Sequence, residues 1–197
     1  EEYKKLTDKI VKKFNLNKKK FIIEIASNDG YFLRNFVRRK IPCLGIEPSK
    51  KAAVISQKNK IPVIKKFYSY QLSKRIKKAD LIIANNVLAH VPNLNDFIRG
   101  IKNNLKDDGI LIIEFGHLLE IIKGIQFDKF YHEHFSYYSL TSVKKILSRF
   151  SLKIFDLNKI PFQGGSLRLY VCHEKKKIKI NKGINKILKD EKRNRLN

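Results

Sequence analysis

The sequence contains no methionine, no tryptophan and only two cysteines. Cys43 and Cys172 are too few and too far apart for a disulfide framework or a four-thiolate zinc site. The chain also lacks a run of about 18 apolar residues and a signal-peptide pattern, so we expect a cytoplasmic protein without a membrane partner. Because it starts with Glu1 and has no methionine, we expect a fragment or one domain of a longer protein.

Acidic residues are scarce, and this imbalance raises the question of a nucleic-acid partner. The chain has 43 lysines and arginines against 18 aspartates and glutamates, a formal net charge of +25. However, lysine predominates and is spread over nearly every helix and loop, and aromatic residues do not alternate with basic ones as in single-strand binders. We therefore expect no specific nucleic-acid partner, although a basic nucleic-acid-binding module stays an alternative.

Short apolar runs alternate with helical patterns over the first part of the chain. Strand patterns occupy residues 21–25, 43–47, 61–64, 79–86 and 110–115. Helical spacing occupies residues 1–16, 32–37, 50–60, 70–78 and 94–105. Residues 107–109 are predicted to form a turn that leads into the strand at 110–115. This alternation predicts an α/β protein with a parallel, doubly wound sheet and helices on both faces.

The pattern changes after residue 118. A helix, an aromatic and histidine-rich loop at 127–138 and a helix at 141–149 come first. Residues 152–157 and 167–172 then face each other across residues 161–165, which predicts an antiparallel pair at one sheet edge. With 197 residues the chain suits one α/β domain, to which we assign residues 1–173. Residues 174–197, rich in lysine and asparagine, are predicted to form a solvated terminal helix or tail.

The first strand ends in a polar turn, Ala26-Ser-Asn-Asp-Gly30, which opens a helical pattern. A parallel sheet binds cofactors at such turns. A dinucleotide needs glycines here so that the backbone can approach its pyrophosphate. Only Gly30 is a glycine, while Ala26 and Asn28 occupy the alternate positions. The turn therefore favours S-adenosylmethionine, which has no phosphate, over a nicotinamide cofactor.

Polar side chains end two other strands. Glu47 follows the second strand, where a carboxylate can accept both hydroxyls of an adenosine ribose or simply cap the next helix. Asn85 and Asn86 follow the fourth strand, where the cleft should open, although Asn-Asn is also ordinary turn chemistry. Glu24 lies inside an apolar strand, so we expect it to accept loop amides or to stand near a cation such as a sulfonium.

The densest polar group is Tyr131-His132-Glu133-His134. A metal site could use His132 and His134, but the spacing matches no zincin pattern and no third ligand lies nearby, so we expect no metal. A second interpretation is that these four residues only form a structural loop. We favour proton transfer, with His134 as general base and Glu133 or Tyr131 orienting it or polarising the substrate.

Two further features are assigned to substrate binding. His90 and His132 could line the cleft, although a histidine beside apolar residues is often structural. Gln163 and Gly164 precede the last strand in Gln163-Gly-Gly-Ser166, where paired glycines indicate a turn with positive φ and also permit a close approach of substrate to the backbone.

Five motifs occur in order and together carry a resemblance: Glu24-Ile-Ala-Ser-Asn-Asp-Gly30, Gly45-Ile-Glu-Pro48, Asn85-Asn-Val-Leu-Ala-His-Val-Pro92, Tyr131-His-Glu-His134 and Gly164-Gly-Ser166. Over residues 20–172 the chain resembles the class I S-adenosylmethionine-dependent C-methyltransferases that act on nucleotide-linked deoxysugars. The resemblance implies a Rossmann-like methyltransferase sheet. It also implies that the Ser27–Gly30 turn, Glu47, Asn85 and Asn86 hold S-adenosylmethionine.

By the same resemblance, His134 removes a proton from a sugar carbon next to a ketone, helped by Tyr131 and Glu133. The chain lacks the family's N-terminal cysteine-rich zinc domain and most of its C-terminal domain. We expect a monomer that methylates a nucleotide-sugar. Alternatives are a methyltransferase acting on oxygen or nitrogen of another small molecule, and a truncated, inactive domain.

Overall fold

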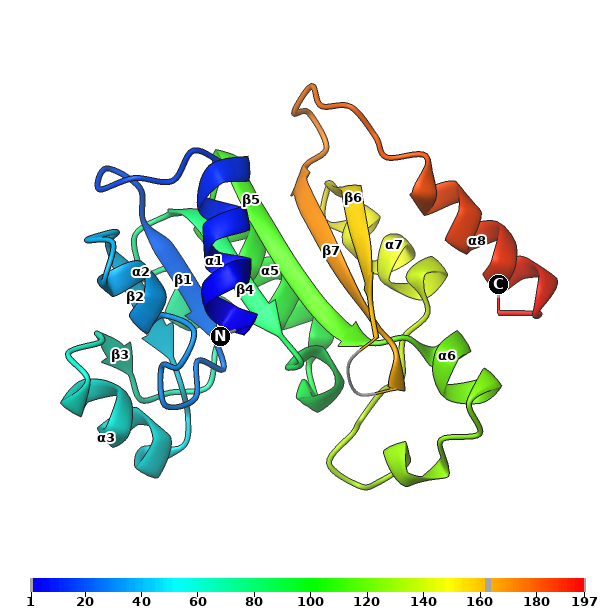
Figure 1. Ribbon diagram of the computed structural model, residues 1–197, viewed down its shortest axis with the longest axis horizontal. Helices are drawn as coiled ribbons and strands as arrows, with labels where there is room; N and C mark the ends of the chain where they lie inside the picture. Colours follow the sequence, from blue (N-terminus) through cyan, green and yellow to red (C-terminus); the bar gives the residue numbers. More distant parts are fainter. Residues whose placement is uncertain (1, 162–163, 197) are drawn as a thin grey trace.

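One sheet forms the centre of the computed structural model, which describes residues 2–161 and 164–196 (Figure 1). Within that part of the chain it has seven strands in the order β3-β2-β1-β4-β5-β7-β6. Neighbouring strands are parallel except that β7 runs antiparallel to both β5 and β6. The strands are β1 (Ile22–Ile25), β2 (Cys43–Ile46), β3 (Val63–Ile64), β4 (Ala79–Asn85), β5 (Leu105–Gly116), β6 (Leu152–Ile160) and β7 (Ser166–His173). The predicted α/β fold, mostly parallel with an antiparallel edge pair, is confirmed.

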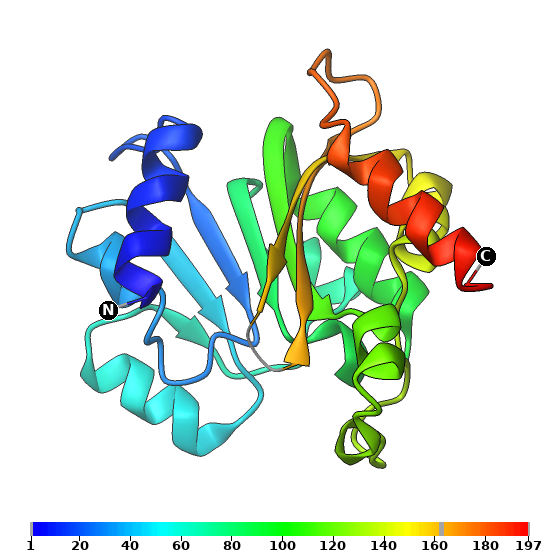
Figure 2. The same ribbon diagram turned by 45° about the vertical axis from the view of Figure 1, so that its right-hand side comes forward.

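Helices cover both faces of the sheet because successive strand residues point to opposite sides. Ile22 joins a core with residues of α1 and α2, whereas Ile23 joins a core with residues of α5, α7 and α8. Figure 2 shows α1 and α8 on opposite sides of the sheet. The helices are α1 (Glu2–Lys13), α2 (Arg34–Val37), α3 (Lys50–Lys58), α4 (Tyr70–Ser73), α5 (Leu94–Asn104), α6 (Leu118–Lys123), α7 (Leu140–Arg149) and α8 (Gly183–Arg193). Among the described residues no helix is both long and apolar enough to cross a membrane.

The predicted turn at residues 107–109 is instead an irregular stretch inside β5. Ala79 of β4 pairs with Leu105 and Leu81 pairs with Ile110, so four residues of β5 bulge out between these two pairs. A bulge accommodates extra residues without ending the strand. The strand therefore begins at Leu105, before the Asp-Asp-Gly sequence that predicts a turn.

The predicted solvated end of the chain is a packed helix. Ile184 and Ile187 of α8 are buried in the core that also contains α7, and Glu191 is completely buried. The prediction of a solvated helix or tail is thus wrong on packing, because α8 has an apolar face that its many lysines conceal in the sequence. The domain boundary at residue 173 stays a prediction.

Candidate active site

The turn after β1 has an unusual backbone. Ala26, Asn28 and Gly30 have φ values of 57°, 52° and 81°. Non-glycine residues rarely adopt this left-handed region. The turn is held to β2, since Ile46 O accepts hydrogen bonds from the amides of Ala26 (2.8 Å) and Ser27 (3.3 Å). The backbone therefore takes positive φ at three alternate positions of the turn, of which only Gly30 is a glycine.

Replacing Gly30 should destabilise this turn. A Cβ added to Gly30 would lie 2.4 Å from Ile61 Cδ1 and 2.9 Å from Ser56 Oγ, in addition to the strain of φ at +81°. We expect Gly30→Ala to lower the free energy of unfolding by about 1–3 kcal/mol in urea denaturation. Gly116→Ala is the matched control, because its added Cβ would approach Ile121 Cδ1 only to 3.6 Å. Equal losses in the two variants would contradict this account.

Glu47 connects the turn to the start of α3. The side chain is 7% exposed, and its Oε2 accepts the Asn28 amide (2.9 Å) while its Oε1 accepts the Ser49 amide (2.8 Å). Ser49 in turn caps α3 through the Ala52 amide. Each carboxylate oxygen can accept more than one hydrogen bond, so Glu47 braces the loop and still has acceptor capacity for a ligand.

Glu24, by contrast, is buried without such support. Its Oε2 finds no hydrogen-bond partner in the described part of the chain. The loop amides, one of the two predicted kinds of partner for Glu24, pair elsewhere: that of Asn28 with Glu47, and those of Ala26 and Ser27 with Ile46 O. Burial, together with the nearby carboxylates of Glu47 and Asp29, raises the pKa of Glu24 well above its usual value. A cationic ligand group nearby would favour its ionised form.

A cleft of about 580 Å³ opens beside this turn at the carboxyl edge of the sheet. Four predicted site residues line it, namely Ala26, Glu47, Asn86 and His90, while Glu24, Ser27, Asn28, Gly30 and Asn85 lie outside its lining. Its remaining wall is largely apolar and aromatic and includes Pro48, Phe67, Tyr68, Val87, Phe97 and Phe135. The sequence reasoning missed Phe67 and Tyr68. Their position shortly after the third strand, at the edge where the cleft was expected, was the available signal.

A polar row crosses the sheet beside Asn85. Asn85 pairs in register with Glu114 of β5, which pairs with Arg168 of β7. Arg168 Nε lies 2.7 Å and Nη2 lies 2.6 Å from Glu114 Oε2, and both side chains are almost buried. Asn85 Oδ1 is buried and meets no partner among the described residues. Asn86 has φ of 51°, which agrees with the turn reading of the Asn-Asn pair, and it also lines the cleft.

His134 is held by two hydrogen bonds within its own loop. Nε2 lies 2.8 Å from the Tyr131 hydroxyl, and Nδ1 lies 3.2 Å from Lys129 O. A carbonyl can only accept, so Nδ1 carries the proton and Nε2 is the basic nitrogen, which accepts from Tyr131. Desolvation and the neighbouring His90 lower the pKa of His134, and the Lys129 carbonyl only partly opposes them. The lowered pKa favours the neutral imidazole over the protonated one.

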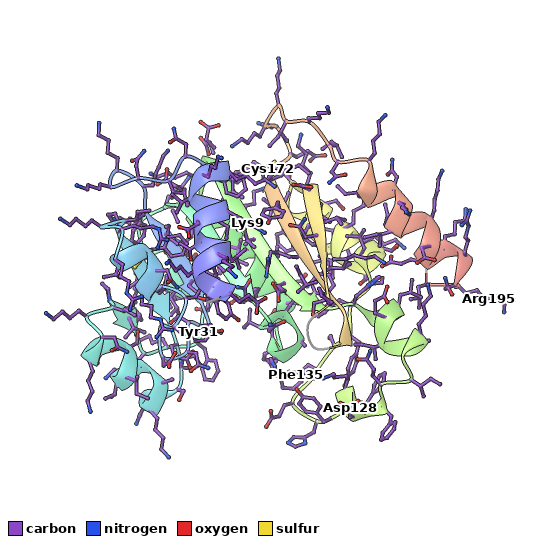
Figure 3. The ribbon with its side chains drawn as sticks, in the orientation of Figure 1. Lys9, Tyr31, Asp128, Phe135, Cys172 and Arg195 are labelled. Carbon is purple, nitrogen blue, oxygen red and sulfur yellow. The ribbon has the colours of Figure 1, made fainter. Side chains whose placement is uncertain are left out.

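His90 ties this loop to the cleft. It ends η1 (Leu88–His90), its ring lies 4.8 Å from the His134 ring between centroids, and its Nδ1 is 2.9 Å from Glu133 O. The Phe135 amide donates to Ala89 O at 2.8 Å, and the Phe135 side chain, labelled in Figure 3, lines the cleft. The structure thus brings Tyr131 and His134 together with His90, which lines the cleft, whereas Tyr131 and His134 lie outside its lining. Glu133 contacts His90 through its backbone, and the side chain of His132 is exposed.

Removing the His90 ring should change the titration of His134. Because the neighbouring His90 lowers the pKa of His134, we expect His90→Gln to raise this pKa, so that the neutral base forms only at a higher pH. The measurement is the histidine-ring NMR signal of His134 followed over pH, with His132→Gln as the control. An unchanged or lower midpoint in His90→Gln would show that the ring contact carries no electrostatic coupling.

The predicted substrate glycines contact the protein itself. Gly164 and Gly165 have φ values of 81° and 111°. A Cβ on Gly164 would lie 1.9 Å from Gln126 Oε1, and Gln126 Nε2 donates to Gly164 O at 2.8 Å. The close approach is therefore made by Gln126, and a substrate role for Gly164 stays a prediction. Gln163 lies outside the described residues.

Residues 2–161 and 164–196 contain no group of three or more His, Cys, Asp or Glu side chains that could hold a metal ion. Both ring nitrogens of His134 are already engaged by Tyr131 and Lys129. These contacts suit an oriented base rather than a metal ligand.

The chain is similar in sequence to known methyltransferases. The family model for a methyltransferase domain matches residues 1–157. The C-methyltransferase NovU from Streptomyces niveus is 27% identical over 173 residues, a stretch that includes 86% of this chain and 41% of that protein. The chain thus spans less than half of the length of this relative.

Solved structures share the fold at low sequence identity. Magnesium protoporphyrin IX methyltransferase from Synechocystis PCC 6803, with bound SAH, superimposes with a TM-score of 0.66 at 14% identity over 86% of this chain and 83% of that chain. An S-adenosylmethionine-dependent methyltransferase from Clostridium acetobutylicum ATCC 824 superimposes with a TM-score of 0.68 at 13% identity. The match covers 87% of this chain and 90% of that chain. At such identities the likeness concerns the fold alone.

Proposed function

The chain belongs to the methyltransferase domain family, and from this premise we propose that it methylates a carbon next to a ketone of a nucleotide-linked deoxysugar. The methyl donor is S-adenosylmethionine, and His134 is the general base. The observation that carries the proposal is the neutral His134 ring, whose basic Nε2 is oriented by Tyr131 and which contacts His90 at the mouth of the cleft. The similarity to a C-methyltransferase supports carbon as the acceptor. We place the enzyme in the cytoplasm as a monomer.

The cleft has the features that a methyl donor requires. Glu47 has acceptor capacity for the ribose hydroxyls, and Phe67, Pro48 and Val87 offer apolar surface to the flat adenine ring. Glu24 lies outside the cleft lining, but its buried Oε2 has no partner among the described residues and would suit a cationic group, whether the ammonium or the sulfonium of the donor. When bound, S-adenosylmethionine supplies a methyl group activated by the positive sulfur.

The base acts on the acceptor sugar. A carbon-bound hydrogen next to a ketone is acidic enough for a positioned imidazole to remove, because the electron pair of the breaking C–H bond moves onto the carbonyl oxygen. His134 Nε2 takes the proton once the Tyr131 hydroxyl turns from Nε2 towards that oxygen and stabilises its developing charge. The new C–C bond forms as the S–CH3 bond breaks, and the electrons of the latter stay on sulfur.

The test separates carbon from oxygen or nitrogen methylation. The chain is incubated in D2O with S-adenosylhomocysteine and a panel of nucleotide-linked keto-deoxysugars, and deuterium is located by NMR. We expect exchange at one carbon next to the ketone, and transfer of labelled methyl from S-adenosylmethionine to that same carbon. Methyl transfer to a heteroatom without carbon exchange would favour the other small-molecule methyltransferase and contradict the proposal.

A further inference from the structure

Helix α6 and the segment that carries Tyr131 and His134 begin and end at neighbouring positions in the fold. This histidine segment, residues 124–137, lies between α6 and the residues that begin α7. At its base the Leu118 amide donates to Tyr138 O at 2.9 Å, and His117 and Tyr138 form an isolated parallel bridge. The start of α6 and Tyr138 therefore lie side by side, and whatever holds them sets the position of α6 and of the histidine segment that follows it.

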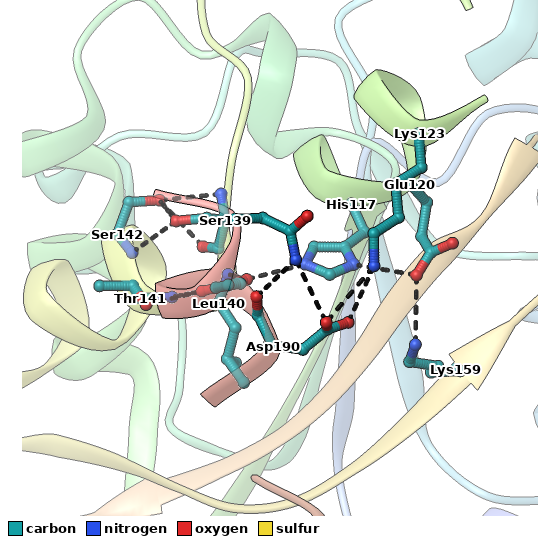
Figure 4. A network of polar contacts seen from close by, with 11 residues as sticks. His117, Glu120, Lys123, Ser139, Leu140, Thr141, Ser142, Lys159 and Asp190 are labelled. Carbon is teal, nitrogen blue, oxygen red and sulfur yellow. Dashed lines mark hydrogen bonds and ion pairs between the residues drawn. The ribbon is translucent and has the colours of Figure 1, made fainter. Parts of the chain in front are cut away.

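Glu191 of α8 binds the start of α6 and the start of α7. Its Oε1 accepts from His117 Nε2 at 2.7 Å and from the Leu140 amide at 2.5 Å. Its Oε2 accepts from the Thr141 amide at 2.8 Å and from the Thr141 hydroxyl at 2.6 Å. His117 caps the start of α6, and Leu140 and Thr141 are the first residues of α7. Figure 4 shows this network, with His117 on one side and Leu140 and Thr141 on the other.

The carboxylate suits this position for physical reasons. The first amides of a helix have no intrahelical acceptor, and the positive end of the helix dipole favours an anion there. Burial alone would raise the pKa of Glu191, but the hydrogen bonds from His117, Thr141 and Leu140 outweigh it and lower the pKa below its usual value. Both side chains, Glu191 and His117, are 0% exposed. Truncation of Glu191 would leave several buried donors without an acceptor.

We propose that Glu191 is a positioning residue for the histidine segment, which keeps His134 against the donor cleft by joining α8 to the starts of α6 and α7. The proposal rests on the proposed function in that it gives His134 a chemical role. Glu191 itself contacts none of the residues that line the cleft in any of these hydrogen bonds. The geometry also predicts that the neighbouring Asp190 is dispensable, since its contact with Lys123 Nζ, at 3.1 Å from Oδ2, lies at the surface.

The test reads the histidine rings directly. NMR signals of the histidines are followed over pH in Glu191→Ala, Glu191→Gln and the matched control Asp190→Asn. We expect Glu191→Ala to shift the His134 and His90 signals and to raise the pKa of His134 towards its ordinary value, because a loosened segment loses its desolvation and the His90 contact. Glutamine keeps one acceptor oxygen, so Glu191→Gln should give an intermediate shift. Asp190→Asn should match the unmodified chain.

Binding and turnover complete the test. S-adenosylhomocysteine affinity should change by less than about threefold in Glu191→Gln, whereas turnover should fall about 10-fold or more at unchanged KM for the donor. If Glu191→Ala does not fold, Thr141→Val, which removes only one donor, replaces it and should shift the same signals less. The proposal would be overturned if the His134 and His90 signals followed pH as in the unmodified chain both in Glu191→Gln and in Glu191→Ala, or in Thr141→Val where that variant replaces Glu191→Ala. The NMR readout needs no methyl transfer, so an inactive wild-type chain would count against the proposed function alone.

Discussion

His134→Gln is expected to lower the rate of methyl transfer by about 100- to 10,000-fold, the usual contribution of a positioned general acid or base. Glutamine is close in size to histidine and can keep a hydrogen bond to Tyr131, but it cannot accept a proton from carbon. The donor cleft is lined by other residues, so the affinity for S-adenosylhomocysteine should change by less than about threefold. Turnover is measured with labelled donor, and affinity by calorimetric titration.

The matched control for this variant is His132→Gln, which makes the same substitution in the same loop. The His132 side chain is exposed, whereas His134 contacts Tyr131, Lys129 and the ring of His90. Deuterium exchange into the sugar should stop in His134→Gln and continue in His132→Gln. Retained exchange in a folded His134→Gln variant would mean that another group removes the proton, and Tyr131→Phe would then be the next variant to measure.

Local patterns were sufficient to predict most of the sheet and the edge of the sheet at which the cleft opens. The alternation of apolar strands with helices, the polar turn after Ile25 and the carboxylate after the second strand depend on neighbouring residues and on the general rule that ligands bind at the carboxyl edge. The prediction that the chain belongs to a methyltransferase family is confirmed by the matching family model. The individual site residues stay predictions. The structure shows only that the rings of His90 and His134 are in contact and that Glu47 accepts a hydrogen bond from the Asn28 amide of the turn.

Contacts between distant parts of the chain were not predictable. Arg168 and Glu114 are 54 positions apart and His117 and Glu191 are 74 apart, so neither pair has a local signature. The burial of α8 was missed for a related reason. Three buried positions in a lysine-rich helix are a weak pattern, and only packing against α7 reveals which face is covered. The bulge in β5 was missed because Asp-Asp-Gly is typical of turns, and strand pairing overrode that preference.

Glu47→Ala is expected to weaken binding of S-adenosylhomocysteine by about 100-fold, or about 2.8 kcal/mol. Two effects act together. The variant loses the acceptor for the ribose hydroxyls, and it leaves the amides of Asn28 and Ser49 without their carboxylate, so the turn is no longer held in its binding conformation. Calorimetric titration measures the affinity, and urea denaturation shows whether the chain stays folded.

Two further variants separate these effects. Glu47→Gln keeps one acceptor oxygen and the shape of the side chain, so it should retain fold stability better and lose less affinity than Glu47→Ala. Glu174→Ala removes an exposed carboxylate just beyond β7, at the opposite edge of the sheet, and should bind like the unmodified chain. If Glu47→Ala bound S-adenosylhomocysteine normally, Glu47 would be only a brace between the turn and α3, and the donor ribose would have to lie elsewhere along the cleft. A loss confined to Glu47→Ala and Glu47→Gln would instead tie the donor site to the turn after β1, which is the geometry that the His134 mechanism requires.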